Sequence, residues 1–173
     1  MKQFALLLAL PLLLGATGSP RELGKREGAC RPGESGPALL VSAVGLKDRT
    51  GNLKLEVYPS TDPEFLQDDA TLVNAGKTFR RVEVPVPAGN PPQLCIRVPG
   101  PGTYSVVLLH DRDRNHKFHW TGDGIGFASN PTIGLSQPKA AAARVQAGGG
   151  LTRVSITLNY LRGLRMRPLA SAS

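Results

Sequence analysis

Aromatic residues, cysteines and long apolar runs are all scarce in this chain of 173 residues. Aromatic side chains make up only 5% of it, which disfavours specific nucleic-acid binding, because bases stack on aromatic platforms. Two cysteines, Cys30 and Cys95, are too few for a Cys-rich zinc site. Catalytic signatures are missing too: there is no GxSxG, Walker or CxxC motif and no paired catalytic carboxylates. We therefore expect a protein that is not an enzyme and has no specific nucleic-acid partner.

The N-terminus has the pattern of a secretory signal peptide. Lys2 precedes the apolar run FALLLALPLLLGA, which is too short to span a bilayer and ends in small residues. We predict a signal peptide over residues 1–18, cut near Gly18, and an exported protein, either periplasmic or secreted. The rest of the chain contains no segment that is long and apolar enough to cross a membrane.

Export changes what is expected of the two cysteines, since an oxidising compartment permits a disulfide between Cys30 and Cys95. Closing a loop of that length would stabilise the fold by about 4 kcal/mol in the chain-entropy model. Two buried free thiols are the alternative.

The chain is distinctly basic, with a formal net charge of +8. Only Lys2 lies in the predicted signal peptide, so the mature chain keeps +7. A basic surface concentrates polyanions through a long-range field that salt screens. We expect an anionic envelope component, such as lipopolysaccharide or an acidic glycan, or else a protein partner.

Apolar and polar residues alternate with a period of two through most of the chain, which is typical of strands with one buried face. The segment LKLEVY, residues 53–58, follows the turn KDRTGN, and in TFRRVEVPV the valines share one face while Arg81 and Glu83 share the wet one. After Asp62, a possible cap, Pro63 begins one short helical turn. About seven such strands with very little helix predict an all-β, antiparallel β-sandwich.

The predicted sandwich has an extension at each end. Residues 19–37 are rich in Gly, Pro and charge and are interpreted as an extended leader. The β-sandwich domain covers residues 38–161, and residues 162–173 form a basic C-terminal tail that we expect to be mobile.

The stretch HDRDRNHKFHWTGDGIGFASNP, residues 110–131, holds all three histidines and the only tryptophan. It follows the apolar strand YSVVLL, so oxygen-bearing side chains gather where a strand ends. Calcium needs several oxygen ligands around one ion. The candidate calcium ligands are Asp111, Asp113, Asn115, Lys117 through its backbone carbonyl, and Asp123.

Two features weaken the match to an EF-hand calcium loop. His116 replaces the glycine of the sharp turn, and Gly122 occupies the position of the bidentate acid, with Asp123 one residue late. As the alternative to calcium, Asp111, Asp113 and Asn115 hydrogen-bond their own backbone as turn formers.

A transition metal is a second option for the same loop. His110, His116 and His119 could offer neutral imidazoles to zinc or copper, with Asp111 or Asp113 as a carboxylate ligand. That arrangement would indicate a metal-binding protein or a metal-dependent enzyme. The alternative is that these histidines are solvated loop residues.

Trp120 and Phe127 are candidate binding residues. Aromatic side chains on a loop can lie against a glycan or a protein partner. Alternatively, both rings fold back to cover the open end of the sandwich, since a long loop needs an apolar anchor of its own.

Taken together, GLKDRTGNLKLEVY, PGPGTYSVVLLHDRDRNHK, GIGFASNP and the closing alternating strand resemble domain-of-unknown-function family 2141, a family of exported bacterial proteins. The resemblance covers roughly Ala38 to Leu161. It implies an immunoglobulin-like or transthyretin-like β-sandwich and no established activity. The family's loop is usually an acidic cation loop, with glycine after the asparagine and an aspartate further on. This sequence has His116 and His119 near those places.

Overall fold

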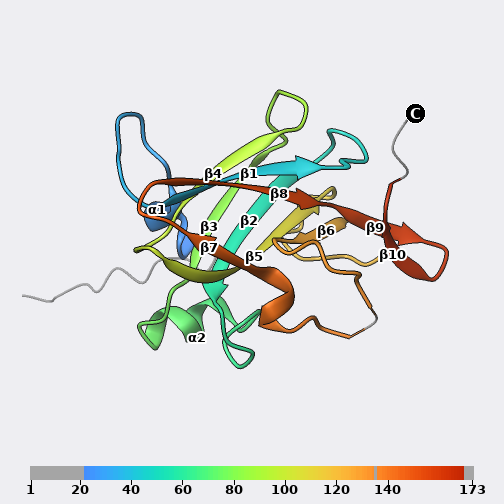
Figure 1. Cartoon of the computed structure of the whole chain (residues 1–173). Coiled ribbons are helices and arrows are strands. Elements are labelled where there is room, and N and C mark those ends of the chain that lie inside the picture. Colours follow the sequence, from blue (N-terminus) through green and yellow to red (C-terminus); the bar gives the residue numbers. More distant parts are fainter. Residues whose placement is uncertain (1–21, 135, 170–173) are drawn as a thin grey trace, which may run out of the picture.

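The computed structural model describes residues 22–134 and 136–169. Strands are their main regular structure, with two short α-helices and one 3-10 helix (Figure 1), which confirms the predicted β-rich chain with little helix. The predicted signal peptide and residues 19–21 of the leader lie outside the described residues. The strands are β1 (Ala38–Val44), β2 (Asn52–Pro59), β3 (Arg80–Pro85), β4 (Gln93–Arg97), β5 (Gly102–Asp111), β6 (Gly124–Phe127), β7 (Arg144–Ala147), β8 (Leu151–Thr157), β9 (Asn159–Arg162) and β10 (Arg165–Pro168).

The strands form two sheets. The smaller has the order β4-β1-β8, and the larger has the order β10-β9-β6-β5-β2-β3 with β7 paired to β5. Two details differ from the expectation of about seven antiparallel strands. Ten strands are present in the described residues, and β1 pairs with β8 in parallel, Ala38 opposite Leu151. A parallel and an antiparallel strand show the same alternation, so the sequence pattern does not distinguish them.

The main core draws apolar side chains from both sheets. Leu53, Leu55 and Val57 of β2 are fully buried together with Leu39 of β1 and Ile96 of β4. These residues occupy alternate positions of their strands, as the period-two pattern predicts.

A second apolar cluster covers part of the opposite face of the larger sheet. Tyr58 and Val107 from the strands pack there with Phe65, Leu72 and Phe79. Leu72 lies on helix α2 (Asp69–Asn74), which begins after Asp68, whose carboxylate accepts the amide hydrogen of Thr71. The helix therefore starts seven residues after Asp62, while the turn predicted at Asp62 and Pro63 is separate, and in it the amide of Phe65 donates to the carbonyl of Thr61 at 2.9 Å. Because both faces are covered here, six consecutive residues of β2 are buried, polar ones included.

The face of β3 that was expected to be wet is also largely covered. The side chains of Arg81 and Glu83 are only 11% and 6% exposed. Arg81 forms ion pairs with Glu56 at 2.7 Å and with Asp69 of α2 at 2.8 Å. Charged residues thus fill a buried layer whose members neutralise one another.

The leader is fastened to the sheets at two places. A disulfide joins Cys30 to Cys95 of β4, which confirms the predicted pair. Helix α1 (Lys25–Gly28) lies against β3, where the backbone amide of Arg81 donates to the carbonyl of Gly24 at 3.1 Å. Gly24 has a φ of 73°, and a Cβ there would lie 2.9 Å from the Cα of Arg80, so this close approach requires glycine.

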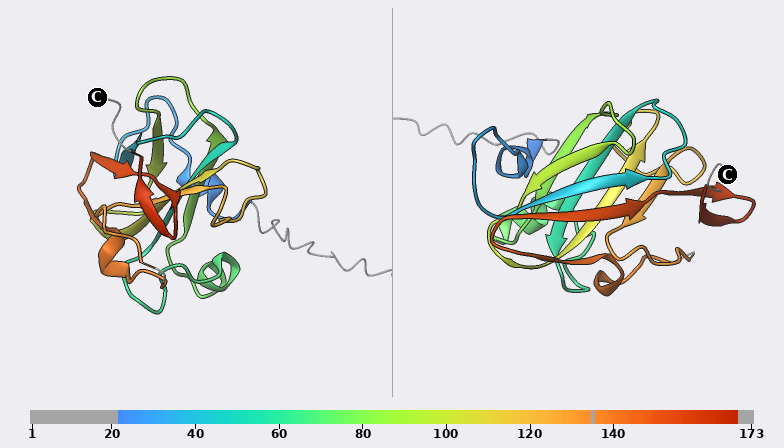
Figure 2. Two further views of the ribbon diagram at one scale, coloured as in Figure 1. Left: turned by 90° about the vertical axis from the view of Figure 1, so that its right-hand side faces the viewer. Right: turned by 45° about the horizontal axis from the view of Figure 1, so that its top comes forward.

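Part of the predicted C-terminal tail is a β-hairpin. Strands β9 and β10 pair from Asn159 to Pro168 at the edge of the larger sheet and project at one end of the molecule, as the right-hand view of Figure 2 shows. Met166 is buried, and the pairing of Asn159 with Ile125 of β6 joins the hairpin to the larger sheet. No described helix has the length and apolar character needed to span a membrane.

Candidate cation-binding loop

Residues 112–123 connect β5 to β6 and begin at one of the most buried strands of the chain. Asp111, the last residue of β5, is fully buried, because the β1–β2 turn packs across it. Gly51 of that turn has a φ of 82°, and a Cβ there would collide with the carbonyl oxygen of Asp111. The glycine of the predicted KDRTGN turn therefore lets two chain segments meet at the start of the loop.

Three carboxylates converge at this point. One oxygen from each of Asp111, Asp113 and Asp123 lies within 4.8 Å of the others. Asp111 and Asp123 are 0% and 1% exposed, whereas Asp113 is exposed. Burial, the neighbouring Asp113 side chain and the charge of Asp123 raise the pKa of Asp111. The cluster consequently favours a proton or a cation among its oxygens.

Backbone amides of the same loop hold these carboxylates in place. Asp111 accepts the amides of Asn115 at 3.2 Å and His116 at 2.8 Å. Asp123 accepts those of Arg112 and His119, at 2.9 and 2.8 Å. These are the hydrogen bonds expected of turn formers. Each carboxylate oxygen has a second lone pair, so the carboxylates that accept these amides can still coordinate a cation.

The remaining predicted oxygen ligands are Asn115 and Lys117. The side-chain oxygen of Asn115 accepts the backbone amide of Lys117 at 2.7 Å, and its amide nitrogen donates to Asp113 at 2.7 Å. Asn115 therefore faces the cluster, while its side-chain oxygen is already engaged with the loop backbone.

Arg112 does not neutralise the cluster with its side chain. Its guanidinium donates to the carboxylate of Asp48 at 2.6 Å through Nη2 and to the carbonyl of Gly122 at 3.1 Å. The hydrogen bond from the Arg112 guanidinium to Asp48 lowers the pKa of the Asp48 carboxylate. The arginine thereby ties the loop to the β1–β2 turn and leaves the three aspartates without a cationic side chain from this position.

His110 is a fully buried residue of the core. Its Nε2–H donates to the carbonyl of Thr50 at 2.8 Å, and its Nδ1 accepts from the hydroxyl of Tyr160 at 2.8 Å. The phenolic oxygen in turn accepts the backbone amide of Lys47 at 3.1 Å. Burial lowers the pKa of His110, which keeps the ring neutral. Both ring nitrogens are thus occupied, so His110 cannot serve as a metal ligand in this arrangement.

His116 faces Glu83, which is not one of the predicted ligands. Its Nδ1 lies 2.7 Å from Oε1 of Glu83 on β3, and its carbonyl accepts from Lys54 Nζ at 2.8 Å. Glu83, Asp111 and His116 can each place one ligand atom within 4.8 Å of the others. The three predicted histidines are not brought together in any such group of described residues.

The two candidate aromatic residues have different surroundings. Phe127 is 2% exposed and lies edge-on to Phe65, with ring centroids 6.2 Å apart, so it is a core residue. Trp120 is half-buried on the loop and packs edge-on against Phe118 at 5.9 Å. Only the Phe118–Trp120 pair therefore presents aromatic surface on the loop.

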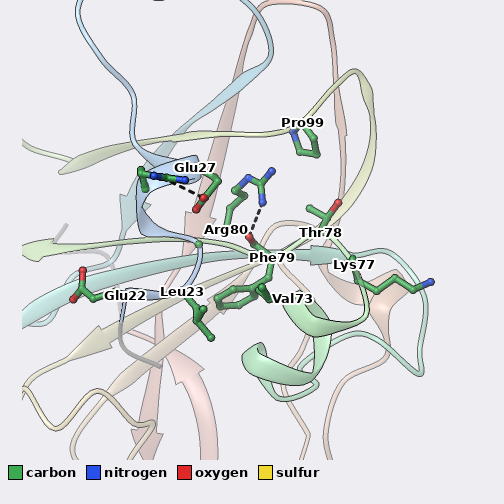
Figure 3. Close-up of a pocket in the computed structure, with 12 residues that line it drawn as sticks. Glu22, Leu23, Glu27, Val73, Lys77, Thr78, Phe79, Arg80 and Pro99 are labelled. Carbon is green, nitrogen blue, oxygen red and sulfur yellow. Dashed lines mark hydrogen bonds and ion pairs between the residues drawn. The ribbon is translucent and has the colours of Figure 1, made fainter. Parts of the chain in front are cut away.

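A pocket lies away from this loop, between the leader and the α2–β3 connection (Figure 3). It has a volume of about 740 Å³. Leu23 and Phe79 line it, and the guanidinium of Arg80 donates to the carbonyl of Phe79. The described residues around it include no Ser, Cys or His, so it offers no nucleophile–histidine pair.

Fold and loop together define a β-rich protein with an acidic, backbone-braced loop at the end of a central strand. The chain belongs to the family described as "Uncharacterized protein conserved in bacteria (DUF2141)", whose model matches residues 41–155. That range includes the entire loop and confirms the resemblance drawn from the sequence. Neither a curated protein nor a solved structure matches the chain.

Proposed function

We propose that this protein is an exported, non-enzymatic β-sandwich module, immunoglobulin-like or transthyretin-like, whose loop 111–123 binds calcium. Support for a sandwich comes from the core cluster, which includes buried residues of both sheets. Support for export comes from the signal-like N-terminus and from the disulfide between Cys30 and Cys95.

The observation that carries the calcium proposal is the convergence of Asp111, Asp113 and Asp123. Three carboxylates at this separation repel one another unless a proton or a cation lies among them. Calcium takes six to eight oxygen ligands in flexible geometry. Because Asp113 is exposed, water molecules can complete the coordination from the solvent side.

Thermal melting of the chain without its signal peptide, in calcium and in EGTA, tests this proposal. A ligand that binds only the native state stabilises it by about 2.7 kcal/mol at one hundred times its dissociation constant. We expect calcium to raise Tm, and we expect Asp113→Asn to abolish that rise. In EGTA the same variant should melt at or above the wild-type temperature, since it removes one repelling charge.

Glu34→Gln is the matched control. Glu34 forms ion pairs with Arg31 and Arg97 and is not part of the acidic cluster. This variant should keep the full calcium shift. A Tm that calcium leaves unchanged in the wild-type protein would contradict the proposal, as would an equal shift in Asp113→Asn.

A second candidate function is transition-metal binding, favoured by the group of Glu83, Asp111 and His116. Two carboxylates and one imidazole suit zinc or a similar divalent metal better than calcium, which prefers oxygen alone. Of the three predicted histidines only His116 belongs to this group, and Glu83 belongs to it although it was not a predicted ligand. If zinc binds here, His116→Gln should remove a zinc-dependent rise in Tm and leave a calcium-dependent rise intact. His119→Gln is the control, and a zinc shift that depends on His119 instead would exclude this ligand set.

The partner that we propose is an anionic component of the cell envelope. The basic charge of the chain attracts such a partner through a field that salt screens. Retention on an anionic matrix should therefore fall steeply with ionic strength, and retention that ignored salt would contradict this proposal.

A further inference from the structure

Positive charge is concentrated in the last part of the chain. Residues 124–173 contain no aspartate or glutamate. Their cationic residues are Lys139, Arg144, Arg153, Arg162, Arg165 and Arg167. Half of these cations lie on the β9–β10 hairpin, which forms the edge of the larger sheet and projects at one end of the molecule in the right-hand view of Figure 2.

The register of the hairpin places its three arginines on one face. Arg165 lies directly opposite Arg162, and Arg167 has the same parity along β10 as Arg165. All three are exposed. Like charges directly opposite one another destabilise a strand pair, and an anion beside this face would relieve that repulsion.

The described carboxylates do not neutralise this face. None of them forms an ion pair with Arg162, Arg165 or Arg167 within the described part of the chain. Arg162 donates to the carbonyl of Pro168 at 3.2 Å, which orients the guanidinium and leaves its charge in place.

An apolar side chain stands at the tip of the same hairpin. Leu164 is 89% exposed, whereas the next most exposed large apolar residue among those that the structure describes, Leu151, is 52% exposed. Gly163 beside it has a φ of 65°, which forms the tight turn that projects Leu164. The other face of the hairpin is anchored by Met166, which is 3% exposed.

We infer that the β9–β10 hairpin docks on an anionic lipid surface, with Leu164 entering the interface and the three arginines facing the headgroups. A soluble polyanion would use the arginines but not an apolar tip, whereas a lipid surface uses both. This inference deepens the envelope contact proposed above and is independent of calcium.

Sedimentation with lipid vesicles tests it, using the chain without its signal peptide in EGTA. Vesicles of phosphatidylcholine alone are compared with vesicles that also contain phosphatidylglycerol. We expect binding to the anionic vesicles only, weakening as salt is raised. Each of Arg162→Gln, Arg165→Gln and Arg167→Gln should weaken the partition about fivefold, and Leu164→Ser about tenfold.

Strand β8 supplies a matched control, because it carries an exposed leucine and an exposed arginine in the same acid-free region. The double variant Leu151→Ser with Arg153→Gln should bind as the wild type does. Equal losses in the control and hairpin variants would overturn the inference. So would equal binding to neutral vesicles, or arginine-dependent binding that Leu164→Ser leaves unchanged, because the latter would indicate a polyanion partner. Melting temperatures of all variants show that they fold. Binding that appears only when calcium replaces EGTA would also overturn the inference, whereas a missing calcium shift in Tm would leave it standing, so the two proposals can fail separately.

Discussion

His110 shows how the location of a single residue changes its chemistry. In the sequence it opens the most polar stretch of the chain and is a candidate metal ligand. In the structure it is the centre of a buried chain of hydrogen bonds that runs from the amide of Lys47 through Tyr160 and the imidazole to the carbonyl of Thr50. This chain joins the β1–β2 turn, β5 and β9, so the histidine positions the start of the acidic loop.

Tyr160→Phe tests the contribution of this hydrogen-bond chain. The substitution removes the hydroxyl but keeps the ring, so it leaves Nδ1 of a fully buried histidine without a partner. An unsatisfied buried polar group costs about 1–3 kcal/mol, and we expect a loss of that size in the free energy of unfolding, measured with urea. Tyr104→Phe is the control, because the Tyr104 hydroxyl donates a single part-buried bond to the carbonyl of Gly100. A loss for Tyr160→Phe no larger than that of the control would contradict this role.

Some individual contacts of the candidate site follow from local spacing and others do not. Asp111, Asp113 and Asn115 follow one strand directly, so their proximity could be predicted. Glu83 lies on another strand, and its contact with His116 depends on how the loop folds back over β3. The pairing of Arg112 with Asp48 is equally non-local, and it explains why that arginine does not neutralise the acidic cluster.

At the level of secondary-structure elements, alternation predicts most strands well because one face of each is buried. β4 is a clear example, with Leu94 and Ile96 buried and their neighbours more exposed. The β9–β10 hairpin was missed, since its alternate residues are arginines and resemble a solvated charged tail. The pattern also does not reveal that β1 and β8 are parallel, because strand direction depends on the connections between distant segments.

The leader is the element whose stability depends most on one covalent bond. The disulfide Cys30–Cys95 closes a loop of 65 residues, and the chain-entropy model assigns about 4 kcal/mol to such a closure. Replacing both cysteines by serine should lower the free energy of unfolding by that amount, measured by urea denaturation. Reductant should destabilise the wild-type protein similarly and leave the double variant unchanged. A double variant within about 1 kcal/mol of the wild type would show that noncovalent contacts of α1 are sufficient to hold the leader.

For the whole molecule, charge is arranged in three separate zones. A buried layer around Arg81 and Glu56 neutralises itself, three carboxylates converge at the end of β5, and the β9–β10 hairpin concentrates positive charge. Net charge alone does not reveal this separation. The proposed calcium loop should therefore respond to calcium and EGTA, whereas the proposed lipid-facing hairpin should respond to ionic strength.

The pH dependence of stability reports on the buried groups in the intact protein. Burial lowers the pKa of His110, so as pH falls the unfolded chain takes up this proton first, near its ordinary value of 6.5. The contribution of neutral His110 is therefore complete above pH 6.5 and is lost as pH falls from there through the folded pKa, by at most about 1.4 kcal/mol per pH unit. Asp111 acts in the opposite direction: its raised pKa means that the folded state takes up the proton first.

We expect the free energy of unfolding, measured with urea in EGTA, to decrease between pH 7.5 and 5.5 as His110 opposes folding. His110→Gln should flatten this decrease, although the variant is less stable at pH 7.5. When the measurement is carried on toward about pH 4, near the ordinary pKa of an aspartate, Asp111→Asn should steepen the decrease, because that variant lacks the proton uptake that the raised pKa of Asp111 gives the folded state. Stability that rises as pH falls through this range would show that the acidic cluster, rather than the buried imidazole, dominates the titration of the fold. Calcium should then remove the rise, because an ion among the three carboxylates keeps Asp111 ionised.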